Sequence, residues 1–146
     1  MNLLFPYDAS VIYLPMRGEI DYRHPAFPLT VFPDSLMLPS DQSADPFVWA
    51  ETVKTRLANK HPYILIPGRA FDLSGTRHGK GGGWYDRFLS KVPWSWLRIG
   101  IASRSQISSS PLLKQVWDEP MDWILSSDGL SWDAHETQAR IHPPKS

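Results

Sequence analysis

The stretch that decides the fold is YILIPGRAFDLSGTRHGKGGGWYDRFL, residues 63–89. Its first four residues, 63–66, form a short apolar run of the length typical of a buried strand. Pro67-Gly68 predicts the end of that strand, because proline has no N–H to donate and glycine turns freely. After a polar, glycine-rich segment, Tyr85, Phe88 and Leu89 fall on one face of a helix. The stretch therefore predicts a strand, a glycine-rich loop and the start of a helix.

The loop combines glycines with basic side chains, which is typical of a phosphate site. Glycines let backbone N–H groups approach an anion, and the first turn of a helix leaves N–H donors unpaired. Arg77 and Lys80 are the best candidates for phosphate contacts, whereas His78 has no partner visible in the sequence. The glycines concerned are Gly79, Gly81, Gly82 and Gly83. Their spacing fits neither the Walker P-loop nor the dinucleotide fingerprint, so a flexible surface connection is the alternative.

Two acids flank this loop. Asp86 lies in the first turn of the expected helix, where the helix dipole favours any carboxylate. A carboxylate beside phosphates would repel them unless a cation lay between, and Mg²⁺ binds one or two carboxylates together with phosphate oxygens and water. Asp72 is expected to have a structural role instead, accepting hydrogen bonds from backbone amides of the loop.

Composition limits the classes of protein to which the chain can belong. Its 146 residues suit one domain, expected over residues 1–128 with a polar tail at 129–146. The net charge of zero gives no general attraction to nucleic acid, and the absence of cysteine excludes disulfides and thiolate chemistry. Five scattered histidines make a zinc site improbable. No apolar run is long enough to span a membrane, so we expect a soluble, cytoplasmic protein.

Further elements follow on both sides of the central stretch. Strands are expected at 11–14, 35–38, 97–102 and 123–125, and one or two helical turns at 111–116. Asp45 and Pro46 predict the start of a helix, as N-cap and first helical residue, with an apolar stripe at Ala50, Val53 and Leu57. Alternating strands and helices predict an α/β fold with a mostly parallel sheet, in which the glycine loop follows the carboxyl end of a strand.

The segment PGRAFDLSGTRHGKGGGWYDRFL resembles the signature of the 5-formyltetrahydrofolate cyclo-ligase (methenyltetrahydrofolate synthetase) family. That signature reads approximately PG-x-AFD-x-x-G-x-R-x-G-x-G-x-GYYDR-x-L, and Trp84 replaces its first tyrosine. The resemblance implies a three-layer Rossmann-like α/β sandwich. It also implies a ligase of one-carbon metabolism that uses ATP and Mg²⁺ to convert 5-formyltetrahydrofolate to 5,10-methenyltetrahydrofolate.

The resemblance further implies roles for individual residues. Asp86 and Asp118 would bind magnesium, and Glu19 would hydrogen-bond the pterin of the folate, although by itself Glu19 is an ordinary loop carboxylate. Trp84 and Tyr85 would be half core and half ligand wall. The nucleotide would lie along residues 77 and 79–86, with Arg77, Lys80 and Tyr85 as the catalytic residues. Gln106 occupies a place comparable to that of a family glutamine.

One departure from the family bears on activity. Members begin with helices whose Lys and Arg reach the nucleotide, whereas this chain begins almost at its first strand. We therefore expect a lone chain to bind ATP weakly and any turnover to appear only in a dimer or larger assembly, of which a homodimer is the simplest. The alternative is a catalytically silent relative that binds nucleotide or phosphate without turnover. Contact with single-stranded RNA is a weaker alternative, because the net charge is zero.

Overall fold

The computed structural model describes residues 7–29 and 32–134, and its frame is a six-stranded sheet of order β2-β1-β3-β6-β8-β9. All neighbours in this sheet are parallel except β8 and β9. The strands are β1 (Ala9–Ile12), β2 (Ser35–Met37), β3 (Pro62–Ile66), β6 (Leu97–Ala102), β8 (Trp123–Ser126) and β9 (Ser131–Asp133). The expected α/β fold with a mostly parallel sheet is confirmed.

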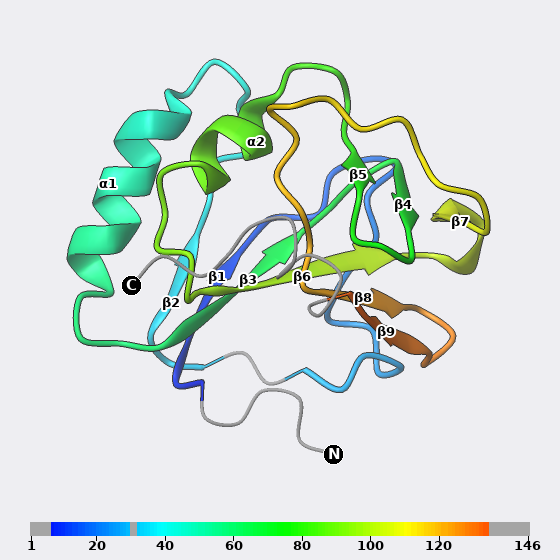
Figure 1. Cartoon of the computed structure of the whole chain (residues 1–146). Coiled ribbons are helices and arrows are strands. Elements are labelled where there is room, and N and C mark those ends of the chain that lie inside the picture. The colour runs from blue at the N-terminus through cyan, green and yellow to red at the C-terminus, as the bar shows by residue number, and fades with distance from the viewer. Residues whose placement is uncertain (1–6, 30–31, 135–146) are drawn as a thin grey trace.

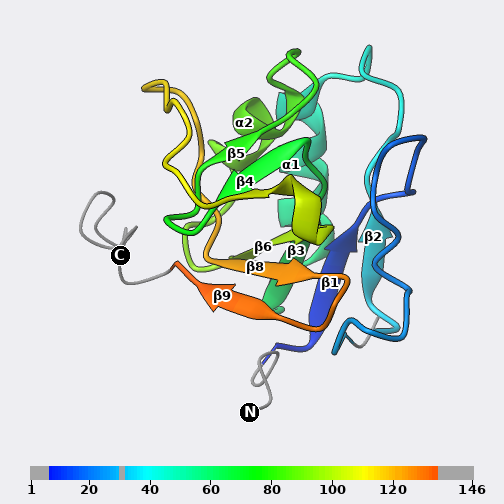
Figure 2. The same cartoon turned by 90° about the vertical axis from the view of Figure 1, so that its right-hand side faces the viewer.

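The central strands are apolar on both sides because both faces of the sheet are covered. Ile64 and Ile66 of β3 pack on the side of the helices, and Tyr63 and Leu65 pack on the opposite side. There the covering layer comes from the segment between β1 and β2, which supplies Tyr22, Phe27 and Leu29 among other residues. In the described residues both α-helices lie on one face of the sheet (Figures 1 and 2).

Helix α1 (Pro46–Arg56) begins as its sequence predicts. The Asp45 side chain accepts a hydrogen bond of 2.9 Å from the backbone N–H of Phe47, and Pro46 stands at the first helical position. The apolar residues Ala50, Val53 and Leu57 are buried. Helix α1 packs against the shorter α2 (Trp84–Leu89) on the sheet.

A small second sheet, of order β5-β4-β7, stands at the carboxyl end of β3 and β6. Its strands are β4 (Ala70–Asp72), β5 (Arg77–His78) and β7 (Ile107–Ser108), the last preceded by a 3-10 turn, η1 (Arg104–Gln106). Phe71 of β4 lies on Gly100 of β6 so closely that a Cβ at position 100 would be 2.5 Å from the Phe71 ring. Glycine at position 100 therefore allows the small sheet to pack against the large one.

Two expectations need correction. Residues 111–116 contain no helix, so the prediction of helical turns there is wrong; this segment crosses the small sheet and gives its Leu112 N–H to the Asp72 carboxylate at 2.8 Å. Strand β9 pairs with β8 inside the region expected as a tail, and Ala134 is buried. Residues 135–146 of that region lie outside the described part of the chain. No described helix has the length and hydropathy needed to cross a membrane.

Candidate active site

A cavity of about 350 Å³ opens over the glycine loop, between the loop that follows β1, the start of α2 and the segment before β8. All the site residues expected from the sequence line it: Glu19, Arg77, Gly79, Lys80, Gly81, Gly82, Gly83, Trp84, Tyr85, Asp86 and Asp118. The fold therefore gathers them around one space. Whether each residue has its expected role remains a prediction.

Arg77 is fixed in place beneath the cavity and is only 8% exposed. Its Nε donates to the Pro67 carbonyl at 2.6 Å, and its guanidinium carbon lies 4.9 Å from the centre of the Tyr85 ring. Among the described residues its two terminal nitrogens have no hydrogen-bond partner. Burial lowers the pKa of Arg77, and Tyr85 and nearby carboxylates oppose that shift. A buried guanidinium with unused donors favours an anionic ligand.

Glycine at position 79 leaves room for this arginine. A Cβ there would lie 2.8 Å from the Arg77 Nη2 atom, so a larger residue would displace the guanidinium. Gly81 and Gly83 have φ angles of +98° and +68°, a conformation that other residues rarely adopt. The loop therefore needs glycine for its shape as well as for access to its backbone.

The backbone of the loop leaves a continuous row of donors free. Within the described part of the chain, the N–H groups of residues 79–86 donate to no protein acceptor. Their row runs from β5 through the glycines into the first turn of α2. Successive backbone N–H groups of this kind make a site for an anion.

Lys80 and Glu19 meet across the cavity. The Lys80 Nζ lies 3.7 Å from a Glu19 carboxylate oxygen, and the other Glu19 oxygen accepts a hydrogen bond of 2.9 Å from the Met16 N–H. The Lys80 side chain is 48% exposed, so it is free to reach a ligand, whereas Glu19 is held by its own turn. Glu19 is thus a fixed acceptor in the cavity wall.

Asp86 and Asp118 line the same cavity from two elements. Asp86 is on α2 and accepts a hydrogen bond of 2.9 Å from the Glu119 N–H, and Asp118 accepts one of 2.8 Å from the Gln115 N–H. Burial raises the pKa of Asp86 and the neighbouring carboxylates add to the shift, while the Glu119 N–H and Arg77 oppose it. The charged form of Asp86 is therefore less favoured than that of an aspartate in water.

The aromatic residues and Asp72 have structural contacts. Trp84 and Tyr85 are buried in the core beside Phe88 and also form part of the cavity wall, and Trp84 donates its Nε1–H to the Ala44 carbonyl at 2.8 Å. Burial raises the pKa of Tyr85 well above its usual range, so its hydroxyl stays neutral. Asp72 accepts from the N–H groups of Ser74, Thr76 and Leu112, which confirms its role in shaping the loop.

His78, for which the sequence showed no partner, also lines the cavity. The other lining residues, Gln42, Leu113, Gln115 and Trp117, were not singled out from the sequence. His78 Nε2 is 2.6 Å from the Leu113 carbonyl, which ties the loop to the segment before β8. Gln106 lies outside the cavity; its side chain accepts from the Ser103 N–H and donates to the Gly68 carbonyl. The missed residues come from distant parts of the chain, and no local pattern marks them.

The fold is similar to that of a solved protein. The structure described as a 5,10-methenyltetrahydrofolate synthetase from Mycoplasma pneumoniae superimposes with a TM-score of 0.50 and 19% identity, covering 84% of this chain and 74% of that chain. At this identity the likeness concerns the fold alone. No curated protein sequence matches the chain significantly.

The family assignment comes from the sequence profile. The profile of the 5-formyltetrahydrofolate cyclo-ligase family matches residues 34–127, which is more than half of the chain. The match spans β2, α1, the glycine loop, Arg77, both cavity aspartates and β8. It confirms the resemblance carried by the segment from Pro67 to Leu89. The chain belongs to the 5-formyltetrahydrofolate cyclo-ligase family.

Proposed function

We propose that the protein is an ATP-dependent 5-formyltetrahydrofolate cyclo-ligase that forms 5,10-methenyltetrahydrofolate. In this reaction the formyl oxygen on N5 attacks the γ-phosphorus of ATP, and ADP leaves. N10 then attacks the activated formyl carbon, and the carbon–oxygen bond breaks with release of inorganic phosphate. Both steps depend on holding two anionic or polar substrates at one place, which is work for positioning and charge neutralisation.

The observation that carries the proposal is the set of unused donors around the cavity. The residues with free N–H groups, 79–86, and the buried Arg77 line one space of about 350 Å³. Charge-assisted hydrogen bonds from such groups are the strong ones in proteins, and they suit phosphate oxygens. These donors also belong to the segment that carries the family signature. We therefore assign this side of the cavity to the triphosphate.

The part of the wall that carries Glu19 is assigned to the folate. Glu19 is held by the Met16 N–H and keeps a second carboxylate oxygen directed toward Lys80 and the cavity. A carboxylate is a suitable acceptor for the N–H groups of a pterin ring. Lys80 belongs to the glycine loop and lies 3.7 Å from Glu19, so its ammonium group can neutralise charge on the phosphate that moves between the substrates.

The donor set fits magnesium bound together with the nucleotide. Within the described residues, no cluster of three or more His, Cys, Asp or Glu could hold a metal ion alone. Asp86 and Asp118 would supply two carboxylates, and the remaining ligands would be phosphate oxygens and water, as Mg²⁺ prefers. The bound ion would offset charge that develops on the phosphates. It would also stabilise the ionised form of Asp86, which burial disfavours.

Tyr85 is assigned the role of supporting Arg77. Because burial raises the pKa of its hydroxyl, Tyr85 cannot act as a base near neutral pH. Its ring instead supports the Arg77 guanidinium from below. The catalytic contribution of the protein thus consists of fixed donors and one mobile lysine.

The test is to mix the purified protein with 5-formyltetrahydrofolate and Mg-ATP. We expect methenyl absorbance and inorganic phosphate to rise together in equal amounts, and neither to rise when ATP or magnesium is omitted. Light scattering of the active sample shows whether the active species is a homodimer. ATP binding without methenyl formation in any assembly would refute the proposal and support a silent nucleotide-binding relative.

A further inference from the structure

A buried arginine outside the cavity joins the two elements that carry the cavity aspartates. Arg98 lies on β6 and is 2% exposed. Side chains alternate along a strand, so Arg98 shares the helix-covered face of the sheet with Gly100 and Ala102. It therefore lies beneath α2, away from solvent.

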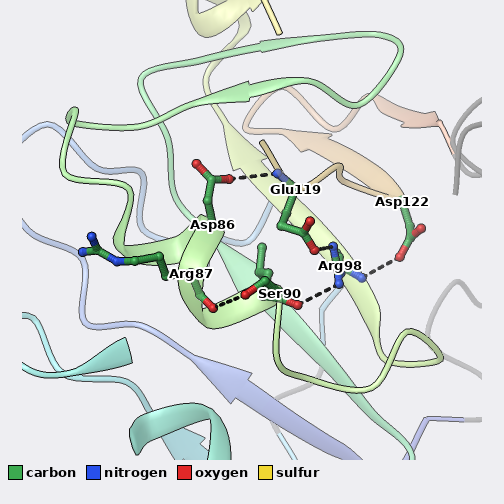
Figure 3. Close-up of polar contacts among 7 residues, drawn as sticks. Asp86, Arg87, Ser90, Arg98, Glu119 and Asp122 are labelled. Atoms are coloured by element: carbon green, nitrogen blue, oxygen red, sulfur yellow. Dashed lines mark hydrogen bonds and ion pairs between the residues drawn. The ribbon is translucent and has the colours of Figure 1, made fainter. Parts of the chain in front are cut away.

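The side chain of Arg98 makes one contact with each of the two elements. Its Nη2 donates to the Leu89 carbonyl at the end of α2 at 3.0 Å, and its Nη1 contacts the Glu119 carboxylate at 3.1 Å. Glu119 in turn donates its backbone N–H to Asp86 (Figure 3). One guanidinium thus connects α2, which carries Asp86, with the segment 115–119, which carries Asp118.

Strand β6 also holds the residues that follow this segment. The Arg98 N–H donates to the Asp122 carboxylate at 2.9 Å, and the Asp122 N–H donates to the Arg98 carbonyl at 2.8 Å. The half-buried Trp94 covers the guanidinium, with its ring centre 4.8 Å from the Arg98 Cζ. Residues 119 and 122 are therefore held to the same point of β6.

Stability alone is a weak reason for this arrangement. A buried ion pair often contributes no more to stability than apolar residues of similar volume, because desolvation offsets the attraction. The Arg98 Nε is moreover buried without a hydrogen-bond partner among the described residues. The geometry instead has a clear consequence, since it sets the position of the Glu119 N–H on Asp86 and of Asp118 beside it.

We propose that Arg98 is a positioning residue, which fixes the separation of Asp86 and Asp118 through Glu119 and the end of α2. The inference rests on the proposed function, in which these two carboxylates hold magnesium with the nucleotide. Arg98 touches neither substrate nor metal. Its effect is to keep two carboxylates from different elements in one arrangement before the ligand arrives.

The first measurement needs no ligand. Hydrogen exchange of the backbone amide at position 119 is compared in wild type, Arg98→Met and the double variant Arg98→Met with Glu119→Leu. Ile12→Ala is the control, because it removes packing from the opposite face of the sheet. We expect the exchange rate of this amide to rise at least about tenfold more in both Arg98 variants than in the control, when the proteins are compared at equal global stability. Equal exchange in variants and control would overturn the inference.

The second measurement is the magnesium concentration that gives half-maximal ATP binding. We expect this concentration to rise several-fold in the Arg98 variants and to stay unchanged in Ile12→Ala. The double variant keeps the test decisive if Arg98→Met alone unfolds, because it replaces both members of the ion pair. Faster exchange with an unchanged magnesium requirement would overturn the positioning role. Wild-type ATP binding that is independent of magnesium would instead refute the proposed metal site.

Discussion

Arg77 and Lys80 are both basic residues of one loop, but their environments differ. Arg77 is buried, bonded to Pro67 and stacked on Tyr85, whereas Lys80 is half exposed and, within the described ranges, pairs with Glu19 alone. Removal of Arg77 would leave the Pro67 carbonyl unpaired and open a gap beside Tyr85. The two residues should therefore respond differently to substitution.

Lys80→Ala should weaken ATP binding by roughly 10- to 150-fold, because it removes a charge-assisted hydrogen bond of about 1.5–3 kcal/mol. Its Tm should not change, since the side chain is half exposed. Arg77→Ala should weaken ATP binding and also lower the Tm. Lys91→Ala, an exposed lysine just after α2, is the control. Unchanged affinity in both site variants by calorimetry would show that the loop is a connection only.

Asp86→Asn should keep or raise the free energy of unfolding at pH 7, and it should raise the magnesium concentration that ATP binding needs. Burial raises the pKa of Asp86 above its ordinary 3.8, so the folded protein binds this proton more tightly than the unfolded chain. Its contribution to the free energy of unfolding therefore falls as the pH rises from 3.8 through the raised pKa. Asparagine avoids this loss, so the variant should be at least as stable as wild type at pH 7, and the difference should vanish below pH 3.8.

The same variant should need more magnesium for ATP binding, because one carboxylate ligand is gone. Thermal unfolding at several pH values and magnesium titrations of nucleotide binding measure the two effects. A lower Tm at pH 7 with no change in magnesium requirement would mean that Asp86 serves only the helix dipole.

At the level of elements, the small sheet β5-β4-β7 positions the loop, and its contact with the large sheet depends on Gly100. Gly100→Ala would place a Cβ against the buried Phe71 ring, at a cost of about 1–3 kcal/mol. We expect a lower free energy of unfolding in denaturant titrations, and partial recovery when Phe71→Leu is added. Gly82→Ala is the control, since its Cβ would meet only the Gln42 side chain at 3.8 Å. Equal stability of Gly100→Ala and wild type would refute this account of the contact.

The elements also show which signals a sequence carries. Strand β6 was predicted with its observed bounds, and α1 with its Asp45 cap, because apolar runs and caps are local patterns. Strands β4, β5 and β7 were missed because two or three residues have no measurable period. Residues 111–116 have an apolar pattern suited to a helix, but the Leu112 N–H and the Leu113 carbonyl hydrogen-bond to Asp72 and His78 on the small sheet.

At the level of the whole molecule, one part of the candidate site could be predicted from the sequence and another part could not. The residues from Arg77 to Asp86 were predicted because one continuous segment carries them, and the profile confirms the family. Trp117 and Leu113 join the cavity from a segment more than 25 positions away, and both are exposed at its rim. Arg98 was missed because a single basic residue within an apolar strand gives no sign of its partners.

The proposed function depends above all on the N–H row of residues 79–86 binding the phosphates of a nucleotide. The most direct test is to record amide chemical shifts of labelled protein during titration with Mg-ATP. The account predicts that the largest shifts occur at residues 79–86 and that they saturate together with the signal of the Arg77 side chain. Saturable binding that leaves these amides unmoved, with shifts concentrated elsewhere, would contradict the claim.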